Sequence, residues 1–437
     1  MVAHDHNIAK VSLWGKTVGA ISYESGRFAF QYAPAWVRHG ISVSPIQLPL
    51  SDRIYVFDAL PHETFKGLPG AFADTLPDDF GNAVIDAWLA RTGRDRDSFN
   101  ALHRLLYTGK RGIGALEYAP AINGRKISSA PVELDSLVEM AQRILDERES
   151  ISEHLQGREE QALMTMLQVG TSAGGARAKA VIGINKDRTK IRSGQGSLPK
   201  GYEHYLLKFD GVVEHSKNKE AFGDPGGFGR MEYAYYLMAK DAGLDMEHCE
   251  LLHEGPRTHF MTKRFDRTGG EKLHYQSLCA MDHADFKRPG QYSYEQLFGV
   301  MRKLRLSRDA AFQMFRRMVF NVVARNQDDH TKNFGFLLMQ DRKWCLAPAF
   351  DIAFSYKPGS PWVNSHQLTI NGKRDNFTRE DLIAPVNSFA ASEADEIIDE
   401  IVDVVSQWPR YSKQAKVFKK LDKKIQESHR LYLGQRP

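Results

Sequence analysis

Two polar side chains in the later half of the chain, Asp328 and Asn333, have types and a spacing that suit phosphoryl transfer. They stand in the run RNQDDHTKNF, residues 325–334, with the pattern D-x-x-x-x-N. An Asp at the first position can accept the proton of an attacking hydroxyl, while the Asn turns back towards a magnesium ion on the phosphates of ATP. Asp351 follows an apolar run and is placed to be the main metal ligand. We therefore predict Asp328 as the catalytic base, with Asn333 and Asp351 binding Mg²⁺.

A β-hairpin would bring these acids together at one edge of a sheet. Residues 334–339 and 344–346 are mostly apolar and flank the polar run QDRK, residues 340–343. Such a pattern predicts two strands joined by a turn. Solvated loops also often contain Asp, Asn and Lys, so by composition alone the segment could equally be an ordinary surface loop. The spacing of Asp328 and Asn333, together with the later Asp351, is the more specific signal.

A run of glycine and small residues, GTSAGGARAK at residues 170–179, is a candidate phosphate cradle. Small side chains let backbone N–H groups approach phosphate oxygens closely. It is not a Walker A loop, because Lys179 is followed by Ala180 rather than by Ser or Thr. A flexible surface loop remains the alternative interpretation.

Lys208 lies inside the apolar run YLLKF, residues 205–209, which predicts a short strand. An ammonium within such a strand is costly unless it is paired, and kinases use a strand lysine to hold nucleotide phosphates. The alternative is a lysine on the exposed face of an edge strand. Glu232, at the start of the next predicted helix, is a possible partner for Lys208.

Composition indicates a globular protein with more than one core. The chain has 437 residues, 42% hydrophobic and 26% charged, and a length of this size predicts two or more domains. A net charge of +5 does not by itself indicate a nucleic-acid-binding protein. The three cysteines form no C-x-x-C pair, which argues against a zinc site and suits the reducing cytoplasm. No signal peptide and no apolar run long enough to span a membrane is apparent.

The predicted elements indicate an α+β fold that begins with strands and ends with helices. Apolar alternation and turn residues predict strands at residues 11–14, 18–23, 28–32 and 54–59. Apolar residues at helical spacing predict helices at residues 82–90, 98–107, 134–148, 231–242 and 309–324, and a mostly helical tail over residues 393–433. The polar segment 123–129 is a candidate boundary between units.

These segments together resemble the HipA family of bacterial toxin–antitoxin serine/threonine kinases. The motifs that carry the resemblance cover most of the chain: Ser172 with GGARAK at 174–179, Lys208, KRFDR at 263–267, Asp328 through Phe334, APAFDI at 347–352, FAFQY at 28–32, LPL at 48–50 and LPDDFG at 76–81.

The resemblance implies a two-lobed, protein-kinase-like catalytic region, a β-rich N-terminal subdomain and a mainly helical C-terminal lobe. The implied segments are residues 1–125 for the N-terminal subdomain, 126–265 for the lobe with the phosphate loop and ATP lysine, and 266–437 for the helical lobe with the catalytic loop.

The resemblance also implies a role for each matching residue. Ser172 matches the serine that the family autophosphorylates, which ejects the phosphate loop and silences the kinase. Asp328 would be the base, while Asn333 and Asp351 would hold magnesium. The residues implied to bind ATP are Gly174, Gly175, Ala176, Arg177, Ala178, Lys179, Lys208, Lys263, Arg264, Phe265, His330, Lys332, Asn333 and Asp351.

Family membership further implies partners and a cellular role. The family pairs with a small helix-turn-helix antitoxin, HipB, which carries the complex to operator DNA, and its best-known target is glutamyl-tRNA synthetase. A toxin of this kind would act in the cytoplasm and inhibit growth through a translation component. The run at residues 278–281, the loop at 222–229 and the insertion around 283–291 depart from the family, which leaves the protein substrate open.

Two alternatives to a protein kinase remain. The basic tail, with Lys413, Lys416, Lys419, Lys420, Lys423, Lys424 and Arg430, would suit a DNA-associated corepressor whose kinase activity is secondary or lost. A helix with a solvated charged face, which needs no partner, is the simpler explanation of these residues. A kinase that acts on small molecules is the other alternative, because the predicted catalytic residues do not specify the acceptor hydroxyl.

Overall fold

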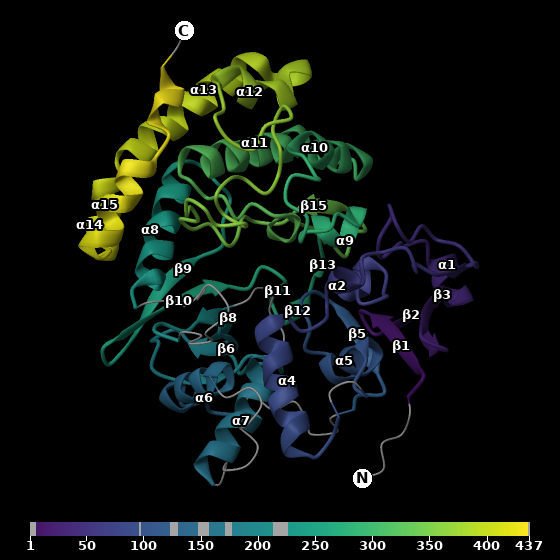
Figure 1. The fold of residues 1–437 in the computed structure, drawn as a ribbon. Coiled ribbons are helices and arrows are strands. Elements are labelled where there is room, and N and C mark those ends of the chain that lie inside the picture. Colours follow the sequence, from purple (N-terminus) through teal and green to yellow (C-terminus); the bar gives the residue numbers. More distant parts are fainter. Residues whose placement is uncertain are drawn as a thin grey trace. The chain divides into compact units, whose positions relative to one another are not determined.

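The computed structural model describes residues 6–95, 98–122, 130–146, 157–170, 177–212 and 226–435. The chain divides into two compact units. Their helices and strands are labelled in Figure 1. Unit 1 comprises residues 1–44, 48–229 and 250–275, and unit 2 comprises residues 45–47, 230–249 and 276–437. No helix in the described part of the chain is long and apolar enough to cross a membrane.

Unit 1 begins with a five-stranded sheet in the order β4-β3-β2-β1-β5. Each pair of neighbouring strands in this sheet runs antiparallel. Along β3, Phe28, Phe30 and Tyr32 are buried and alternate with more exposed residues, as expected for a sheet with one face on a core. The strands are β1 Ile8–Leu13, β2 Lys16–Glu24, β3 Arg27–Tyr32, β4 Ile54–Tyr55 and β5 Leu116–Ala119. The first three predicted strands are confirmed, whereas the fourth is only two residues long.

A second five-stranded sheet in unit 1 has the order β7-β6-β8-β10-β9. Its strands are β6 Lys179–Asn185, β7 Ile191–Ser193, β8 Tyr202–Lys208, β9 Cys249–Glu254 and β10 Arg257–Lys263. Strand β8 is central, with β6 and β10 as antiparallel neighbours. The alternative interpretation of Lys208 as a residue of an edge strand is therefore wrong.

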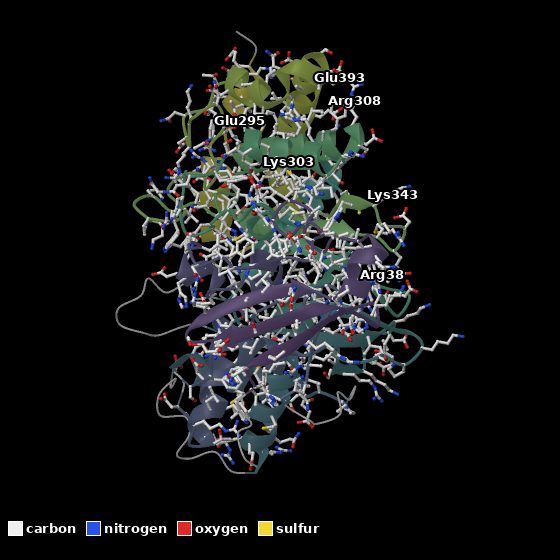
Figure 2. All side chains as sticks on the ribbon, turned by 90° about the vertical axis from the view of Figure 1, so that its right-hand side faces the viewer. Arg38, Glu295, Lys303, Arg308, Lys343 and Glu393 are labelled. Carbon is white, nitrogen blue, oxygen red and sulfur yellow. The ribbon has the colours of Figure 1, made fainter. Side chains whose placement is uncertain are left out.

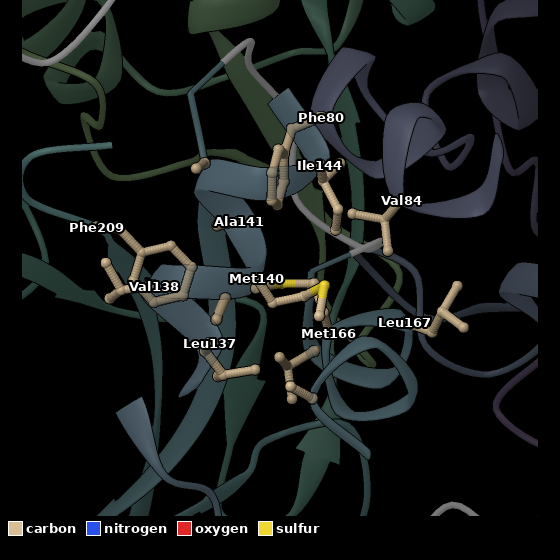
Figure 3. Packing of buried hydrophobic residues seen from close by; sticks show 14 of the residues in the cluster. Phe80, Val84, Leu137, Val138, Met140, Ala141, Ile144, Met166, Leu167 and Phe209 are labelled. Atoms are coloured by element: carbon tan, nitrogen blue, oxygen red, sulfur yellow. The ribbon is translucent and has the colours of Figure 1, made fainter. Parts of the chain in front are cut away.

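Three helices of unit 1, α4, α6 and α7, bury their apolar residues in one cluster with the second sheet (Figure 3). Phe80, Met140, Ile144 and Met166 from the helices lie in this cluster with Phe209, which follows β8. The helices of unit 1 are α1 Pro34–His39, α2 His62–Phe65, α3 Gly70–Ala73, α4 Asp79–Arg91, α5 Ala101–Thr108, α6 Leu134–Asp146 and α7 Arg158–Val169, and a short hairpin is formed by β11 Arg267–Thr268 and β12 Glu271–Lys272.

Unit 2 is mainly helical. Its helices are α8 Phe228–Asp241, α9 Leu278–Asp282, α10 Tyr294–Lys303, α11 Arg308–Val323, α12 Arg379–Ile383, α13 Asn387–Ser406, α14 Trp408–Ala415 and α15 Lys419–Ser428, with 3₁₀ turns η1 Thr331–Asn333, η2 Ala384–Val386 and η3 Leu431–Gly434. A three-stranded sheet has the order β13-β14-β15, with β13 at His274–Ser277, β14 at Gly335–Leu338 and β15 at Trp344–Leu346.

The predicted α+β class, β-rich at the start and helical at the end, is confirmed. Five predicted helices correspond to α4, α5, α6, α8 and α11, and the tail is helical as predicted. Polar caps explain why α10 and α11 begin where they do, because the Ser293 and Ser307 hydroxyls accept from backbone N–H groups of the first turn. Helix α7 was not predicted from the sequence.

Candidate functional site

The β14–β15 hairpin brings the segments of Asn333 and Asp351 to the same place. Phe336 is paired with Leu346, and at the open end the Ala347 N–H donates to the Gly335 carbonyl at 2.9 Å. Because Asn333 precedes β14 and Asp351 follows β15, both residues lie just beyond this open end. The predicted hairpin is confirmed.

Asp328 is held at the same place through its backbone. The Gln327 N–H donates to the Ser355 carbonyl and the Ser355 N–H donates to the Arg325 carbonyl, both at 3.1 Å, so the loop before Asp328 pairs with the segment after Asp351. The Asn333 Nδ2 group donates to the Asp328 carbonyl at 2.7 Å. The Asp328 side chain itself remains 45% exposed. A fixed backbone with an accessible carboxylate suits a general base.

Two residues of this region adopt left-handed backbone conformations that residues other than glycine seldom adopt. Asp351 has φ +57° and Arg325, at the start of the loop, has φ +59°. Such conformations cost free energy and persist where the surrounding structure enforces them, often at functional sites. One of them is the candidate metal ligand Asp351 and the other begins the loop that carries Asp328, which supports a functional interpretation of this region.

The segment around Phe286 packs on the turn between Asp328 and Asn333. The rings of Phe286 and His330 lie 5.5 Å apart, and the Lys332 Nζ atom lies 4.7 Å from the centre of the Phe286 ring. His330 Nε2 is 3.9 Å from Asp328 Oδ1, while its Nδ1 atom is buried without a hydrogen-bond partner among the described residues. The segment 283–291, which we expect from the sequence to depart from the family, therefore contacts the predicted ATP-site residues His330 and Lys332.

A buried network surrounds Asp329, the neighbour of the candidate base, and was not predicted from the sequence. Asp329 is 1% exposed, and its carboxylate accepts hydrogen bonds from the Tyr294 hydroxyl at 2.9 Å, His366 Nδ1 at 2.8 Å and the Gln367 N–H at 2.7 Å. Burial alone would raise the pKa of Asp329, but His366 and the other donors outweigh it and lower the pKa below the usual value. The sequence showed two adjacent acids, of which only Asp328 fits the D-x-x-x-x-N spacing.

In unit 1, Lys208 ends the central strand of the second sheet. It is paired with Lys179 on β6 and with Phe260 on β10, and its Nζ atom lies 5.8 Å from the centre of the Phe260 ring. The carboxylate of Asp210, two residues later, accepts from the Gly227 N–H at 2.9 Å and the Thr258 N–H at 2.8 Å. These bonds fix the backbone that follows Lys208. Glu232 belongs to unit 2, and its pairing with Lys208 stays a prediction.

Lys179, predicted to bind ATP, forms a buried ion pair within unit 1. Its Nζ atom lies 2.8 Å from Asp78 Oδ2, and the two side chains are 2% and 7% exposed. Asp78 also caps helix α4, because its side chain accepts from the Gly81 N–H at 2.6 Å. Burial raises the pKa of Asp78, while Lys179 and the Gly81 N–H oppose that rise. The ammonium of Lys179 is thus bound to Asp78 in the protein interior, and a contact of this residue with ATP stays a prediction.

The other predicted ATP-site residues of unit 1 fall into two segments. Within the cradle, the Arg177 guanidinium lies 4.7 Å from the centre of the Phe228 ring, and the carbonyl of the buried Ala178 accepts from the Phe209 N–H at 3.1 Å. Ser172, Gly174, Gly175 and Ala176 lie outside the described residues.

The second segment, Lys263 to Phe265, uses its charged side chains for structure. Lys263 Nζ lies 2.6 Å from Glu203 Oε1. The Arg264 guanidinium donates to both carboxylate oxygens of Asp266, at 2.8 and 2.7 Å. Burial raises the pKa of Asp266, but the neighbouring arginines outweigh this effect and hold the pKa well below the usual range. Phe265 is half-buried, with its ring 5.4 Å from that of Tyr275. Contacts from this segment to an adenine would therefore involve its backbone and the Phe265 ring.

The donor set in unit 2 fits a magnesium ion bound together with phosphates. Among the described residues no three His, Cys, Asp or Glu side chains gather as a complete metal site. Mg²⁺ is commonly held by one or two protein oxygen ligands and completes its shell with water and phosphate oxygens. The oxygens of Asn333 and Asp351, at the open end of one hairpin, match that requirement.

Two family models together cover most of the chain. The HipA N-terminal domain matches residues 9–119, and the HipA-like C-terminal domain matches residues 171–408, which is more than half of the chain. The protein therefore belongs to the HipA family.

Comparison with solved structures supports the same fold. The chain is similar to a chain of the Shewanella oneidensis MR-1 toxin–antitoxin complex of HipA, HipB and operator DNA, with a TM-score of 0.65 and 17% identity over 98% of this chain and 96% of that chain. A lower similarity, with a TM-score of 0.34 and 14% identity, is to the Helicobacter pylori proinflammatory kinase CtkA, over 53% of this chain and 89% of that chain. No curated protein matches the sequence significantly.

Proposed function

We propose that this protein is an ATP-dependent serine/threonine protein kinase that uses Mg²⁺ and acts as the toxin of a HipBA-like pair. The observation that carries the proposal is the arrangement around Asp328. The backbone of Arg325 and Gln327, just before it, is bound to Ser355, and the Asp328 carbonyl accepts from Asn333 while its carboxylate stays accessible. Asn333 and Asp351 leave the open end of the adjoining hairpin.

In this proposal each side chain has a defined task. Asp328 orients the acceptor hydroxyl and accepts its proton, while the oxygens of Asn333 and Asp351 hold the metal. Magnesium, when bound, neutralises charge on the ATP phosphates. Lys208 contributes a further positive charge to phosphate binding. The backbone that follows it is fixed by the hydrogen bonds that the Asp210 carboxylate accepts.

The backbone of the cradle at residues 174–179 approaches the phosphates, and the segment Lys263 to Phe265 contacts the adenine. His330 and Lys332 line the ATP site. The segments 1–125, 126–265 and 266–437 are proposed as the N-terminal subdomain and the two kinase lobes.

The test is phosphoryl transfer from γ-labelled ATP by purified protein. Asp328→Asn should reduce kcat by about 10²–10⁴-fold, the range typical for loss of a general base. Asp341→Asn is a matched control, because Asp341 lies in the hairpin turn and its side chain is 57% exposed. Equal activity of Asp328→Asn and wild type would refute the assignment of the base.

Autophosphorylation at Ser172 is proposed as the off-switch. A phosphate there would add about −1.5 to −2 charges where the nucleotide phosphates bind, so it should repel them. Mass spectrometry of protein incubated with ATP should detect phospho-Ser172, and the fully modified protein should bind ATP poorly. Unchanged ATP affinity of that form would contradict the mechanism.

A HipB-like helix-turn-helix antitoxin and, through it, operator DNA are the proposed partners in the cytoplasm. Family membership and the similarity to HipA in a solved complex with HipB and DNA support this. The proposed substrate is a translation component, with glutamyl-tRNA synthetase as the first one to test. Brief induction of wild type and Asp328→Asn, followed by phosphoproteomics, should reveal the acceptor as a site labelled only by the wild type.

A DNA-associated corepressor with secondary or lost kinase activity is the second candidate. The exposed lysines of helices α14 and α15 and their connection favour it: Lys413, Lys416, Lys419, Lys420, Lys423 and Lys424. Such a protein would bind operator DNA without an antitoxin, and its affinity would fall steeply as salt rises. Salt-insensitive binding, or none, would leave the kinase proposal in place.

A further inference from the structure

Arg430, far along the chain from the candidate base, reaches the buried network behind it. The guanidinium is 1% exposed, and its Nη1 group donates to the Val322 carbonyl at 2.9 Å, at the end of helix α11. Nη1 also lies 2.9 Å from His366 Nε2. Nη2 pairs with Asp375. Arg430 thus joins the C-terminal segment to the helix and to the histidine that contacts Asp329.

These contacts fix the protonation pattern of His366. An arginine is only a donor, so His366 Nε2 must accept from Arg430 and carry no proton. The proton of the neutral ring therefore lies on Nδ1, where it donates to Asp329 Oδ2 at 2.8 Å. The side chain of His366 is fully buried, and so is that of Asp329. The result is a directional chain from guanidinium to imidazole to carboxylate.

The C-terminal segment also holds the loop through its backbone. The Arg430 N–H donates to the Val323 carbonyl at 2.9 Å, and Arg325 Nε donates to the Ser428 carbonyl at 2.8 Å. In the amide orientation that satisfies both of its ends, Gln327 Oε1 accepts from Arg430 Nη2 at 3.0 Å. Gln327 and Asp329 are the residues on either side of Asp328. Gln327 therefore contacts Arg430 directly, and Asp329 is linked to Arg430 through His366.

We propose that Arg430, acting through His366 and Asp329, is a positioning residue that sets the conformation of the loop carrying Asp328. The proposal rests on the proposed function for its kinetic consequence. It assigns the C-terminal segment a part in phosphoryl transfer, because displacing a catalytic group by about 1 Å from its productive position can cost about 10²-fold in rate. Arg430 itself contacts no reacting atom.

Conservative variants of the full-length protein test the proposal. Arg430→Lys keeps a positive charge but cannot bind His366, Val322 and Asp375 together, so kcat should fall roughly 10- to 100-fold while KM for ATP changes little. Arg308→Lys is the matched control, because Arg308 forms a surface ion pair with Glu393, both labelled in Figure 2, and should retain full activity.

Two substitutions of His366 separate the ends of the chain of contacts. In His366→Asn the amide can replace Nδ1 and donate to Asp329, whereas in His366→Gln the carbonyl can replace Nε2 and accept from Arg430. If the contact with Asp329 carries the effect, His366→Asn should retain more activity than His366→Gln. A KM effect without a kcat effect, or equal kcat in Arg430→Lys and wild type, would overturn the proposal.

Hydrogen–deuterium exchange gives a readout that does not depend on kinase activity. Arg430→Lys should speed exchange of the amides of residues 326–333 while leaving helix α13 unchanged. Unchanged exchange in that loop would overturn the proposal. A wild type that transfers no phosphate would refute the proposed function, and the exchange comparison would still decide whether Arg430 positions the loop.

Discussion

Breaking the buried ion pair between Lys179 and Asp78 should destabilise unit 1 without weakening ATP binding. The two charged atoms lie 2.8 Å apart and the side chains are almost fully buried. Removing one partner of such a pair leaves an uncompensated buried charge, which costs about 3–5 kcal/mol of unfolding free energy. Lys179→Met should therefore lose about that much stability.

The loss should depend on pH in a defined direction. Burial raises the pKa of Asp78, and without Lys179 nothing of opposite charge in that pair opposes the rise. The folded state of Lys179→Met then binds a proton that the unfolded state releases above its ordinary pKa near 4. The variant should consequently recover stability relative to wild type as the pH falls from neutral towards 4.

The double variant Asp78→Asn, Lys179→Met separates the charge from the helix cap. Asn is as good an N-cap as Asp, so the bond from the Gly81 N–H survives and no charge remains buried. The double variant should regain most of the stability lost by Lys179→Met.

Two measurements decide the outcome. Urea unfolding combined with hydrogen–deuterium exchange should show faster exchange in helix α4, which begins after Asp78, while helix α13 of unit 2 serves as the internal control. Unchanged stability of Lys179→Met would refute the reasoning about burial. A sharp fall in ATP affinity with unchanged stability would show that the ammonium serves the nucleotide and not Asp78.

Three further predictions concern the catalytic loop, the metal and the pH. Phe286→Ala removes the ring that contacts the Lys332 ammonium, an interaction worth about 0.5–1 kcal/mol. The rate of phosphoryl transfer should therefore fall by no more than about fivefold. A larger loss in steady-state assays would show that the ring has another role. Asp351→Asn should raise the magnesium concentration needed for half-maximal transfer, whereas Asp341→Asn should leave it unchanged. Burial lowers the pKa of the fully buried His274 to about 4, so the unfolded state binds the proton first and stability is lost as the pH falls from about 6.5 to 4. The free energy of unfolding lost through His274 is roughly 3 kcal/mol. In urea titrations, the stability of His274→Gln should depend less steeply on pH than that of wild type. An unchanged pH dependence would show that His274 does not contribute to it.

The hairpin and the strong helices were predictable because their signals are local. The polar turn between two apolar runs specified β14 and β15, and the register then followed from the short connection. Helix α11 was predicted from apolar residues at helical spacing, with a serine at its start. The sequence was therefore sufficient to place Asn333 and Asp351 at one end of a hairpin.

The long-range contacts were not predictable, because no local pattern specifies them. Lys179 and Asp78 are 101 residues apart, and the role of the lysine depends on that distant partner. His366 lies 37 residues from Asp329 and 64 from Arg430, so only the folded chain shows that the three side chains meet. Lys208 was equally ambiguous, since periodicity does not tell a central strand from an edge strand, and only the pairing with β6 and β10 did so.

The turn that joins β14 to β15 offers a practical route into this protein. Lys343 and Asp341 are exposed there, with side chains 81% and 57% accessible, and Lys343 projects from the turn in Figure 2. Exposed loop tips of this kind accept inserted sequence well. A fluorescent tag or epitope placed between them would leave the strand register intact, whereas a single residue added within β15 would reverse the faces of its side chains and shift Asp351. The same hairpin can thus carry a reporter at its closed end while it holds the proposed chemistry at the other.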